Sequence, residues 1–378
     1  MTLQYNAVAL FSGGLDSILA ARLIQDQGLA VKCIHFTSPF FGKAESIPHW
    51  RKVYGLDIDA VDVGEAFVSM LAERPAHGFG KVLNPCVDCK ILMMRQAVTI
   101  MRELGATILV SGEVLGQRPM SQRRDTLNVI RRDADVRGFL IRPLSAKLLE
   151  ETEAELNGTI DRSRLGTISG RGRKDQLDLA RALCITEIPT PAGGCLLTER
   201  ENARSYWPVL LHTPKAVAND FDLCNTGRQY WNLDVPKTPL HLCIGRNQAD
   251  NARLLTLARQ GDIIFKTASF PGPIALGRPF PGNAWDATVV HSAATFAASF
   301  SPKSTAFAES SNKPVLVKTY AGPDYAAIMR PMEENAVPSV AVTPCRNGSW
   351  REYSWDEARE QIRAEARERQ SMSTSSTV

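Results

Sequence analysis

A short polar segment, Ser12 to Ser17, holds the first residues of the chain that could do chemistry. It follows an apolar run, residues 7–11, that predicts a buried strand, and it precedes a helical pattern over residues 18–24. Two glycines permit a tight turn, and the start of a helix directs free N–H groups at an anion. Kinase-type loops end in Gly-Lys-Ser/Thr, whereas this segment offers the Asp16 carboxylate and two serine hydroxyls. It therefore predicts a phosphate site, and the alternative is a turn in which a polar side chain only caps the helix.

Three of the eight cysteines are also spaced for chemistry. Cys86 and Cys89 form a C-x-x-C pair directly before a helix predicted over residues 91–104, and thiolates are favoured at a helix N-terminus. Such a pair alone is ambiguous among zinc, redox and iron–sulfur sites. Cys195 ends a loop, residues 189–195, that contains two prolines and two glycines and presents one thiol. We expect Cys184 to lie on an apolar helix face instead.

The elements that must position these groups alternate between strands and helices. Apolar runs predict strands over residues 7–11, 30–36, 56–63 and 107–110. This order is typical of a doubly wound α/β fold, in which a parallel sheet is covered on both faces and ligands bind at the carboxyl ends of the strands. Both Phe36 and the phosphate segment would lie at that edge of the sheet.

Two further stretches are candidates for the same crevice. A polar segment, Ser111 to Gln122, directly follows the strand that ends near residue 110, although it could be a plain loop with turn glycines. Residues 118–147 contain eight Arg or Lys and three Asp, and residues 162–174 contain five basic residues and no acid. A charge run is often only a solvated face, but two of them beside a crevice indicate a polyanion held by its phosphates. The candidate contacts are Arg123, Arg124, Arg171, Arg173 and Lys174.

Composition limits the class of protein. The 378 residues are 44% hydrophobic and 22% charged with a net charge of +4, and they contain no apolar run long enough to span a membrane. The N-terminus lacks the basic and apolar regions of a signal peptide. Eight cysteines in such a chain favour a reducing compartment over a disulfide framework. We expect a cytoplasmic protein of two domains with a C-terminal tail.

The segment Ser12-Gly13-Gly14-Leu15-Asp16-Ser17 matches the Ser-Gly-Gly-x-Asp-Ser motif and resembles the PP-loop of ATP pyrophosphatases. Enzymes of that superfamily cleave ATP between the α and β phosphates and adenylate a substrate oxygen. Gly112-Glu113, Gly116-Gln117 and Ser121-Gln122 resemble a segment of tRNA 4-thiouridine synthetases. The resemblance implies Mg²⁺ and ATP, with nucleotide contacts from the following residues: Phe11, Ser12, Gly13, Gly14, Asp16, Ser17, Phe36, Gly112 and Gln117.

The cysteines resemble those of the iron–sulfur-dependent tRNA thiolases, which pair a PP-loop with a C-x-x-C and a distant third cysteine. This resemblance implies a [4Fe–4S] cluster bound by Cys86, Cys89 and Cys195. Asn84-Pro85-Cys86 is also similar to the 2-thiouridylases, in which such a cysteine carries a persulfide. Zinc or purely structural thiols are the remaining alternative.

The pattern changes near residue 200. Segments at residues 240–251, 261–265 and 270–273 resemble the RNA-binding module of the NFACT proteins, and the alternative is a small α+β domain used for dimerisation. We therefore divide the chain into a PP-loop ATP-binding and sulfur-transfer domain (1–200), an NFACT-like RNA-binding α+β domain (201–345) and a tail (346–378). In the tail we expect an exposed helix over residues 356–370 and disorder from residue 371 onward.

The resemblance implies an ATP-dependent tRNA sulfurtransferase that replaces a uridine carbonyl oxygen with sulfur, of the 4-thiouridine or 2-thiouridine type. Its catalytic residues would be Asp16, Cys86, Cys89 and Cys195. Its partners would be tRNA and a sulfur donor, either sulfide or a persulfide carrier, and it could form a homodimer. The rival classes are a PP-loop ligase acting on a small molecule and a non-catalytic RNA-binding or sulfur-trafficking protein.

Overall fold

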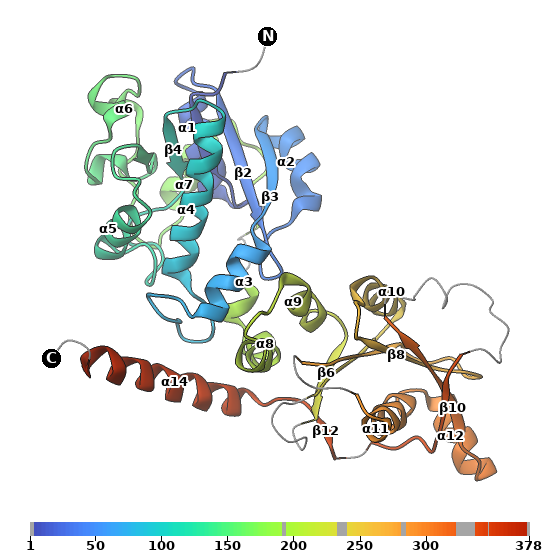
Figure 1. Cartoon of the computed structure of the whole chain (residues 1–378). Helices are drawn as coiled ribbons and strands as arrows, with labels where there is room; N and C mark the ends of the chain where they lie inside the picture. The colour runs from blue at the N-terminus through green and yellow to red at the C-terminus, as the bar shows by residue number, and fades with distance from the viewer. Residues whose placement is uncertain are drawn as a thin grey trace. The chain divides into compact units, whose positions relative to one another are not determined.

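A computed structural model describes residues 4–190, 194–232, 240–280, 285–322, 337–346 and 348–375. The chain divides into two compact units, Met1–Thr198 and Glu199–Val378 (Figure 1). Within the described residues, no helix is both long enough and apolar enough to cross a membrane.

The first unit is built on a parallel sheet. Its strands are β1 (Ala7–Leu10), β2 (Val31–Thr37), β3 (Asp57–Asp62), β4 (Ile108–Ser111) and β5 (Leu140–Ile141). They lie in the order β3-β2-β1-β4-β5, and every neighbouring pair is parallel. The strand order reverses between β1 and β4, where a doubly wound sheet forms its binding crevice. The predicted α/β class is confirmed.

Helices cover both faces of this sheet because successive residues of a strand point to opposite sides. Ala7 and Ala9 pack in one core with residues of α1 and α2, whereas Val8 and Leu10 pack in another core with residues of α4. The helices are α1 (Leu15–Gln25), α2 (Ile47–Tyr54), α3 (Gly64–Glu73), α4 (Cys86–Glu103), α5 (Arg124–Asp133), α6 (Glu153–Leu156) and α7 (Lys174–Ala182), with short 3₁₀ turns η1 (Ala44–Ser46), η2 (Ala146–Leu148), η3 (Arg162–Arg164) and η4 (Leu196–Thr198).

The second unit contains an antiparallel sheet, as the predicted α+β class requires. Its strands are β6 (Arg228–Asn232), β7 (Leu240–Ile244), β8 (Ile263–Thr267), β9 (Ala275–Arg278), β10 (Val315–Ala321), β11 (Ser339–Val342) and β12 (Trp350–Arg351), in the order β11-β10-β8-β9-β7-β6-β12. Alternate residues of β7 face two cores: Leu242 packs with α11, and Cys243 packs with α10. The helices are α8 (Arg200–His212), α9 (Ala218–Cys224), α10 (Gln248–Leu257), α11 (Ala287–Ala298), α12 (Pro302–Ser311) and α14 (Trp355–Ser375).

Polar residues of the NFACT-like segments hold this second unit together. The Asn247 side chain caps α10 by accepting from the Asp250 N–H at 2.9 Å, and the Asn251 side chain accepts from the Ile274 N–H at 3.0 Å. Asp262 is 1% exposed and pairs with the buried Arg278. These roles are structural, so RNA binding by this unit stays a prediction.

The tail helix is longer than expected. Helix α14 includes the residues predicted to be helical, but it continues through 371–375, so the prediction of disorder is wrong there. Its first half is anchored because Gln361 accepts hydrogen bonds from Trp207 Nε1 at 2.8 Å and Tyr353 OH at 2.6 Å. Once a helix is nucleated, each added residue costs little. Residues 376–378 lie outside the described residues.

Candidate active site

The polar segment after β1 is shaped to bind an anion. The backbone N–H groups of Gly13, Leu15 and Asp16 make no hydrogen bond to the described part of the chain. They lie at the start of α1, where the helix dipole is positive. The Ser17 hydroxyl donates to the Gly14 carbonyl at 2.7 Å and accepts from the Ser12 N–H at 3.2 Å, which holds the turn in place. Free N–H groups at a fixed helix start are what phosphate binding requires.

The Trp50 ring packs against the turn. Gly13 has φ +78°, and a Cβ atom there would lie 2.4 Å from the Trp50 ring, so only glycine fits. Phe11 and His35 both contact Trp50 edge-on. Phe11 and Phe36 are themselves buried core side chains, so only their backbone is left for a nucleotide.

His35 ties β2 to the turn. The Lys43 N–H donates to His35 Nε2 at 2.8 Å, so the proton is on Nδ1, which donates to the Phe11 carbonyl at 3.0 Å. Burial lowers the pKa of His35, because the charged ring would lose its hydration. The imidazole is therefore a neutral structural link at neutral pH. No local motif in the sequence indicated this role.

The second polar segment meets the first across the sheet. A Cβ atom on Gly112 would lie 2.7 Å from the Asp16 backbone, so β4 ends directly against the first turn of α1. Gln117 Nε2 donates to Asp16 Oδ2 at 3.0 Å. The structure thus brings together Asp16, Gly112 and Gln117, although Asp16 and Gln117 are 101 residues apart in the sequence.

The second basic stretch, residues 162–174, is bonded to the polar segment that follows β4. Ser145 is fully buried, and its hydroxyl accepts from the Leu115 N–H at 3.0 Å and donates to the Ile168 carbonyl at 2.7 Å. The Gly170 N–H donates to the Leu115 carbonyl at 2.7 Å. These bonds fix the start of the basic loop, whose charged side chains are exposed and form no ion pair within the described residues: Arg171, Arg173 and Lys174.

Other members of the basic stretches stabilise the fold. Arg142 is 4% exposed and donates to Glu113 at 3.0 Å. Arg162 pairs with Glu155, and Arg164 pairs with Asp26. Arg123 pairs with the neighbouring Asp125 at 3.0 Å, and Arg124 donates to the Leu148 carbonyl at 3.1 Å. Several positive charges of the two runs are therefore already paired with acidic side chains of the protein.

The cysteines gather near the N-terminus of α4. Helix α4 begins at Cys86, earlier than the predicted start at residue 91, so the C-x-x-C pair lies in its first turn. Asn84 Nδ2 donates to Cys86 Sγ at 3.1 Å. The segment after Cys195 is tied to this end by a 3.1 Å bond from the Leu83 N–H to the Leu197 carbonyl. Burial raises the pKa of the Cys89 thiol to about 12, and Cys195 and Cys86 add to the rise because like charges nearby disfavour the thiolate. The three thiols thus interact electrostatically, although residues 191–193 of the predicted loop lie outside the described residues.

The thiols are not arranged as a metal centre. In the described part of the chain, no three His, Cys, Asp or Glu side chains are placed to hold a metal ion. The donor types suit an iron–sulfur cluster, which takes cysteine thiolates, but these sulfur atoms would have to move to bind one. Of the buried thiols, Cys33 and Cys243 belong to apolar cores, and Cys224 donates to the Ser205 carbonyl at 3.4 Å.

Comparison with known proteins agrees with this geometry. Residues 2–154 match the family described as thiamine biosynthesis protein (ThiI). The matched residues make up less than half of the chain. This range contains the phosphate segment, the C-x-x-C pair and Gly112 to Gln122, but it ends before the basic loop at 171–174 and before Cys195.

Two curated proteins are similar to part of the chain. A probable tRNA sulfurtransferase of Thermococcus kodakarensis is 30% identical over 172 residues, which is 43% of each chain. Another of Methanosarcina mazei is 28% identical over 127 residues, 30% of this chain and 29% of that one. The chain thus spans less than half the length of the curated relatives it matches. A solved structure, a predicted subunit of a tRNA methyltransferase from Methanocaldococcus jannaschii, is 16% identical, covers 36% of this chain and 66% of that one, and has a TM-score of 0.27, too low to establish a shared fold.

The high pKa of Cys89 predicts slow alkylation of the metal-free protein. A raised pKa leaves less thiolate at neutral pH, and the thiolate is the nucleophile. The rate of Cys89 modification by iodoacetamide should therefore still rise about tenfold per pH unit between pH 8 and pH 10. Peptide mass spectrometry measures this rate. A rate that levels off near pH 9, as for an ordinary thiol of pKa about 8.5, would contradict the raised pKa of Cys89.

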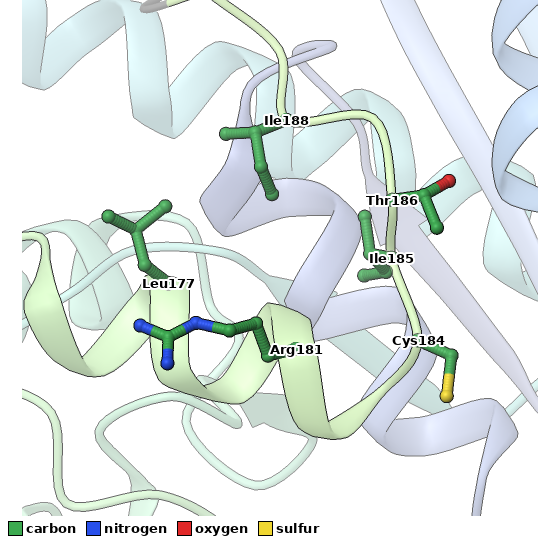
Figure 2. Close-up of a pocket in the computed structure, with 6 residues that line it drawn as sticks. All are labelled: Leu177, Arg181, Cys184, Ile185, Thr186 and Ile188. Atoms are coloured by element: carbon green, nitrogen blue, oxygen red, sulfur yellow. The ribbon is translucent and has the colours of Figure 1, made fainter.

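A separate pocket lies on the far end of α7. It measures about 470 Å³ and is lined by Leu177, Arg181, Cys184, Ile185, Thr186 and Ile188. Figure 2 shows the first two on the helix and the other four on the chain that follows it. None of the predicted site residues lines it. Cys184 is exposed here, which corrects its predicted place on an apolar helix face: it follows the end of α7 with φ +55°.

Proposed function

We propose that this chain is an ATP-dependent tRNA sulfurtransferase that adenylates a uridine and replaces its carbonyl oxygen with sulfur, giving 4-thiouridine or 2-thiouridine. One observation carries this proposal. The backbone N–H groups of Gly13, Leu15 and Asp16 are free, and they lie beside the Asp16 carboxylate, which Gln117 holds in place. The names of the two curated relatives support the reaction class.

The turn before α1 would hold the ATP phosphates. Its N–H groups point at the anion, and the Ser12 hydroxyl is on the exposed side. The Asp16 carboxylate is partly exposed and makes its hydrogen bond through one oxygen, which leaves the other for Mg²⁺. Together with a bound Mg²⁺, the helix dipole would offset the charge that develops on the departing pyrophosphate.

The reaction would take place in two displacements. The uridine carbonyl oxygen attacks the α-phosphate, a new O–P bond forms, pyrophosphate leaves, and the ring N–H proton is lost to solvent. A sulfur nucleophile then adds to the ring carbon, the C–O bond breaks, and AMP leaves with the electron pair. The target base must leave its stack to reach the crevice.

The three cysteine thiols would form the part of the site that delivers sulfur. We propose Cys86, Cys89 and Cys195 as ligands of a [4Fe–4S] cluster, since bound positive iron would offset the cost of burying the Cys89 thiolate and its repulsion by the other two thiolates. These three residues would hold the cluster, which would supply the sulfur nucleophile of the second displacement. Anaerobically purified protein should then be brown and contain about four irons.

A persulfide on Cys86 is the second candidate, and one contact favours it. The 3.1 Å bond from Asn84 Nδ2 would stabilise a sulfur anion at this position. After attack on the ring carbon, a second cysteine thiolate would cleave the S–S bond and form a disulfide, which an external thiol reductant must reopen. A colourless, iron-free protein with full activity would establish this route.

The basic loop would hold the tRNA. Arg171 and Arg173 are exposed and lie next to a segment fixed against Leu115. The double variant Arg171→Ser/Arg173→Ser should weaken tRNA binding and lower the slope of log K against log salt by about 1 to 2, because each lost phosphate contact removes a released counterion. Arg181→Ser removes an exposed charge near the end of α7, the helix that follows this loop, and is the matched control. An unchanged slope in the double variant would make the loop a solvated surface.

The second unit could add RNA contacts. The guanidinium groups of Arg228 and Arg346 lie over the Phe300 ring at 5.7 and 4.3 Å, an arrangement of cations and an aromatic ring that suits nucleic acid. This supports an RNA-binding role for the unit. Homodimer formation and a cytoplasmic location stay predictions.

Formation of AMP and pyrophosphate from ATP tests the proposal. Purified protein with Mg²⁺ should form both only when unmodified tRNA is present. Turnover on a small acceptor without tRNA would instead indicate a PP-loop ligase. Tight RNA binding with no consumption of ATP would indicate a non-catalytic protein.

A further inference from the structure

Three charged side chains, two of them buried, form a cluster whose members neighbour residues of the proposed site in the chain. It combines Lys90 on α4, Glu113 just after β4 and Arg142 just after β5. Arg142 Nε donates to Glu113 Oε2 at 3.0 Å, and the two side chains are 4% and 2% exposed. The other carboxylate oxygen, Oε1, has no hydrogen bond within the described residues, and Lys90 Nζ lies 3.9 Å from it.

The position of this group connects the thiols with the phosphate turn. Lys90 directly follows Cys89, and Glu113 directly follows Gly112, which abuts the backbone of Asp16. The group therefore joins a residue next to one of the thiols in the chain to a residue next to the glycine that abuts the phosphate turn. No pattern in the sequence joins these residues, because they come from three separate elements.

Only the lysine of this group can reach a ligand. Its side chain is 29% exposed, whereas the other two are almost sealed from solvent. A separation of 3.9 Å is too long for a hydrogen bond, so the ammonium group keeps its donors for another partner. The Glu113 carboxylate attracts the ammonium group and so fixes where it lies, while Arg142 holds that carboxylate in place.

We propose that Lys90 is a catalytic residue of the sulfur-transfer step, and this inference depends on the proposed function. Its ammonium group would contact the phosphate of the adenylated uridine, and Glu113 and Arg142 would be positioning residues. In this step hydrosulfide adds to the ring carbon, the C–O bond breaks, and AMP departs with the electron pair and its negative charge. No atom changes oxidation state overall, and Lys90 stabilises the charge on the leaving AMP.

With Lys90 in this role, different groups stabilise the leaving group in each of the two displacements. The charge on departing pyrophosphate develops at the phosphate turn and would be offset there by the start of α1. The charge on departing AMP develops where the ring carbon meets sulfur, beside the C-x-x-C pair. Loss of Lys90 should therefore slow the second displacement and spare the first.

The experiment compares Lys90→Met, Lys90→Arg and Glu113→Gln with the wild type, using unmodified tRNA and sodium sulfide. Two rates are measured: tRNA-dependent exchange of labelled pyrophosphate into ATP, and formation of thionucleoside. In Lys90→Met, exchange should stay within threefold while thionucleoside formation falls about 10²- to 10³-fold, the usual effect of losing one electrostatic stabiliser. Adenylated tRNA should accumulate, Lys90→Arg should recover most of the rate, and Glu113→Gln should show the same split as Lys90→Met.

Lys81→Met is the control, because Lys81 is an exposed lysine shortly before the C-x-x-C pair. It should change neither rate. Equal loss of exchange and transfer in Lys90→Met, or no loss of either, would overturn the role of Lys90. If the wild type itself shows no tRNA-dependent exchange, the proposed function fails and this inference fails with it.

Discussion

Replacing Asp16 by asparagine should abolish the formation of AMP and pyrophosphate, with a loss of at least about 10³-fold. The amide can still accept the 3.0 Å hydrogen bond from Gln117, so the turn should keep its shape. What disappears is the negative charge that would bind Mg²⁺. Losing the charge stabilisation of a bound metal costs several kcal/mol of transition-state energy, and each 1.36 kcal/mol is about tenfold in rate.

The control for this variant lies at the other end of the same helix. Asp26 is exposed and follows the last turn of α1, where it pairs with Arg164. Asp26→Asn should leave turnover within a factor of about 2, since surface ion pairs contribute little. Thermal melting of both variants checks that each one folds. Wild-type turnover in Asp16→Asn would refute the role of the phosphate turn.

Serine at Cys86, Cys89 or Cys195 should abolish thiolation and leave adenylation intact. Each substitution replaces a thiol by a hydroxyl group of similar shape, so we expect little change in packing. Because the hydroxyl neither carries a persulfide nor ligates iron, thionucleoside formation should fall by about 10³-fold or more. The tRNA-dependent pyrophosphate exchange should stay within about threefold, because the phosphate turn is unchanged.

Cys184→Ser and Cys345→Ser are the matched controls, since both thiols are exposed and neither lies at the proposed site. They should retain full thiolation. A Cys195→Ser variant that thiolates at the wild-type rate would remove that residue from the site. The centre would then consist of the C-x-x-C pair alone.

Local patterns in the sequence predicted the parts of the fold that depend on neighbouring residues. The strand, turn and helix around Ser12 to Ser17 were predictable because the glycines, the apolar run and the helical periodicity all lie within 18 residues. The body of α4 was predictable for the same reason, although the helix starts at Cys86, directly after Pro85, and not at residue 91.

Residues that act across the fold were not predictable in this way. His35 and Ser145 bond to partners 24 and 30 residues away, and nothing in their own segments marks them. Charge counting failed for Arg142 because its partner Glu113 lies on a different strand end. Cys184 was misplaced because the helical pattern continued past the point where α7 ends.

The most direct test of the central claim is mass spectrometry of tRNA nucleosides. A strain that lacks this protein would be complemented with the wild type or with Asp16→Asn, and total tRNA would be digested and compared. The account predicts that one thiouridine species disappears in the deletion strain, returns with the wild type and stays absent with the variant. An unchanged set of thionucleosides in the deletion strain would contradict it.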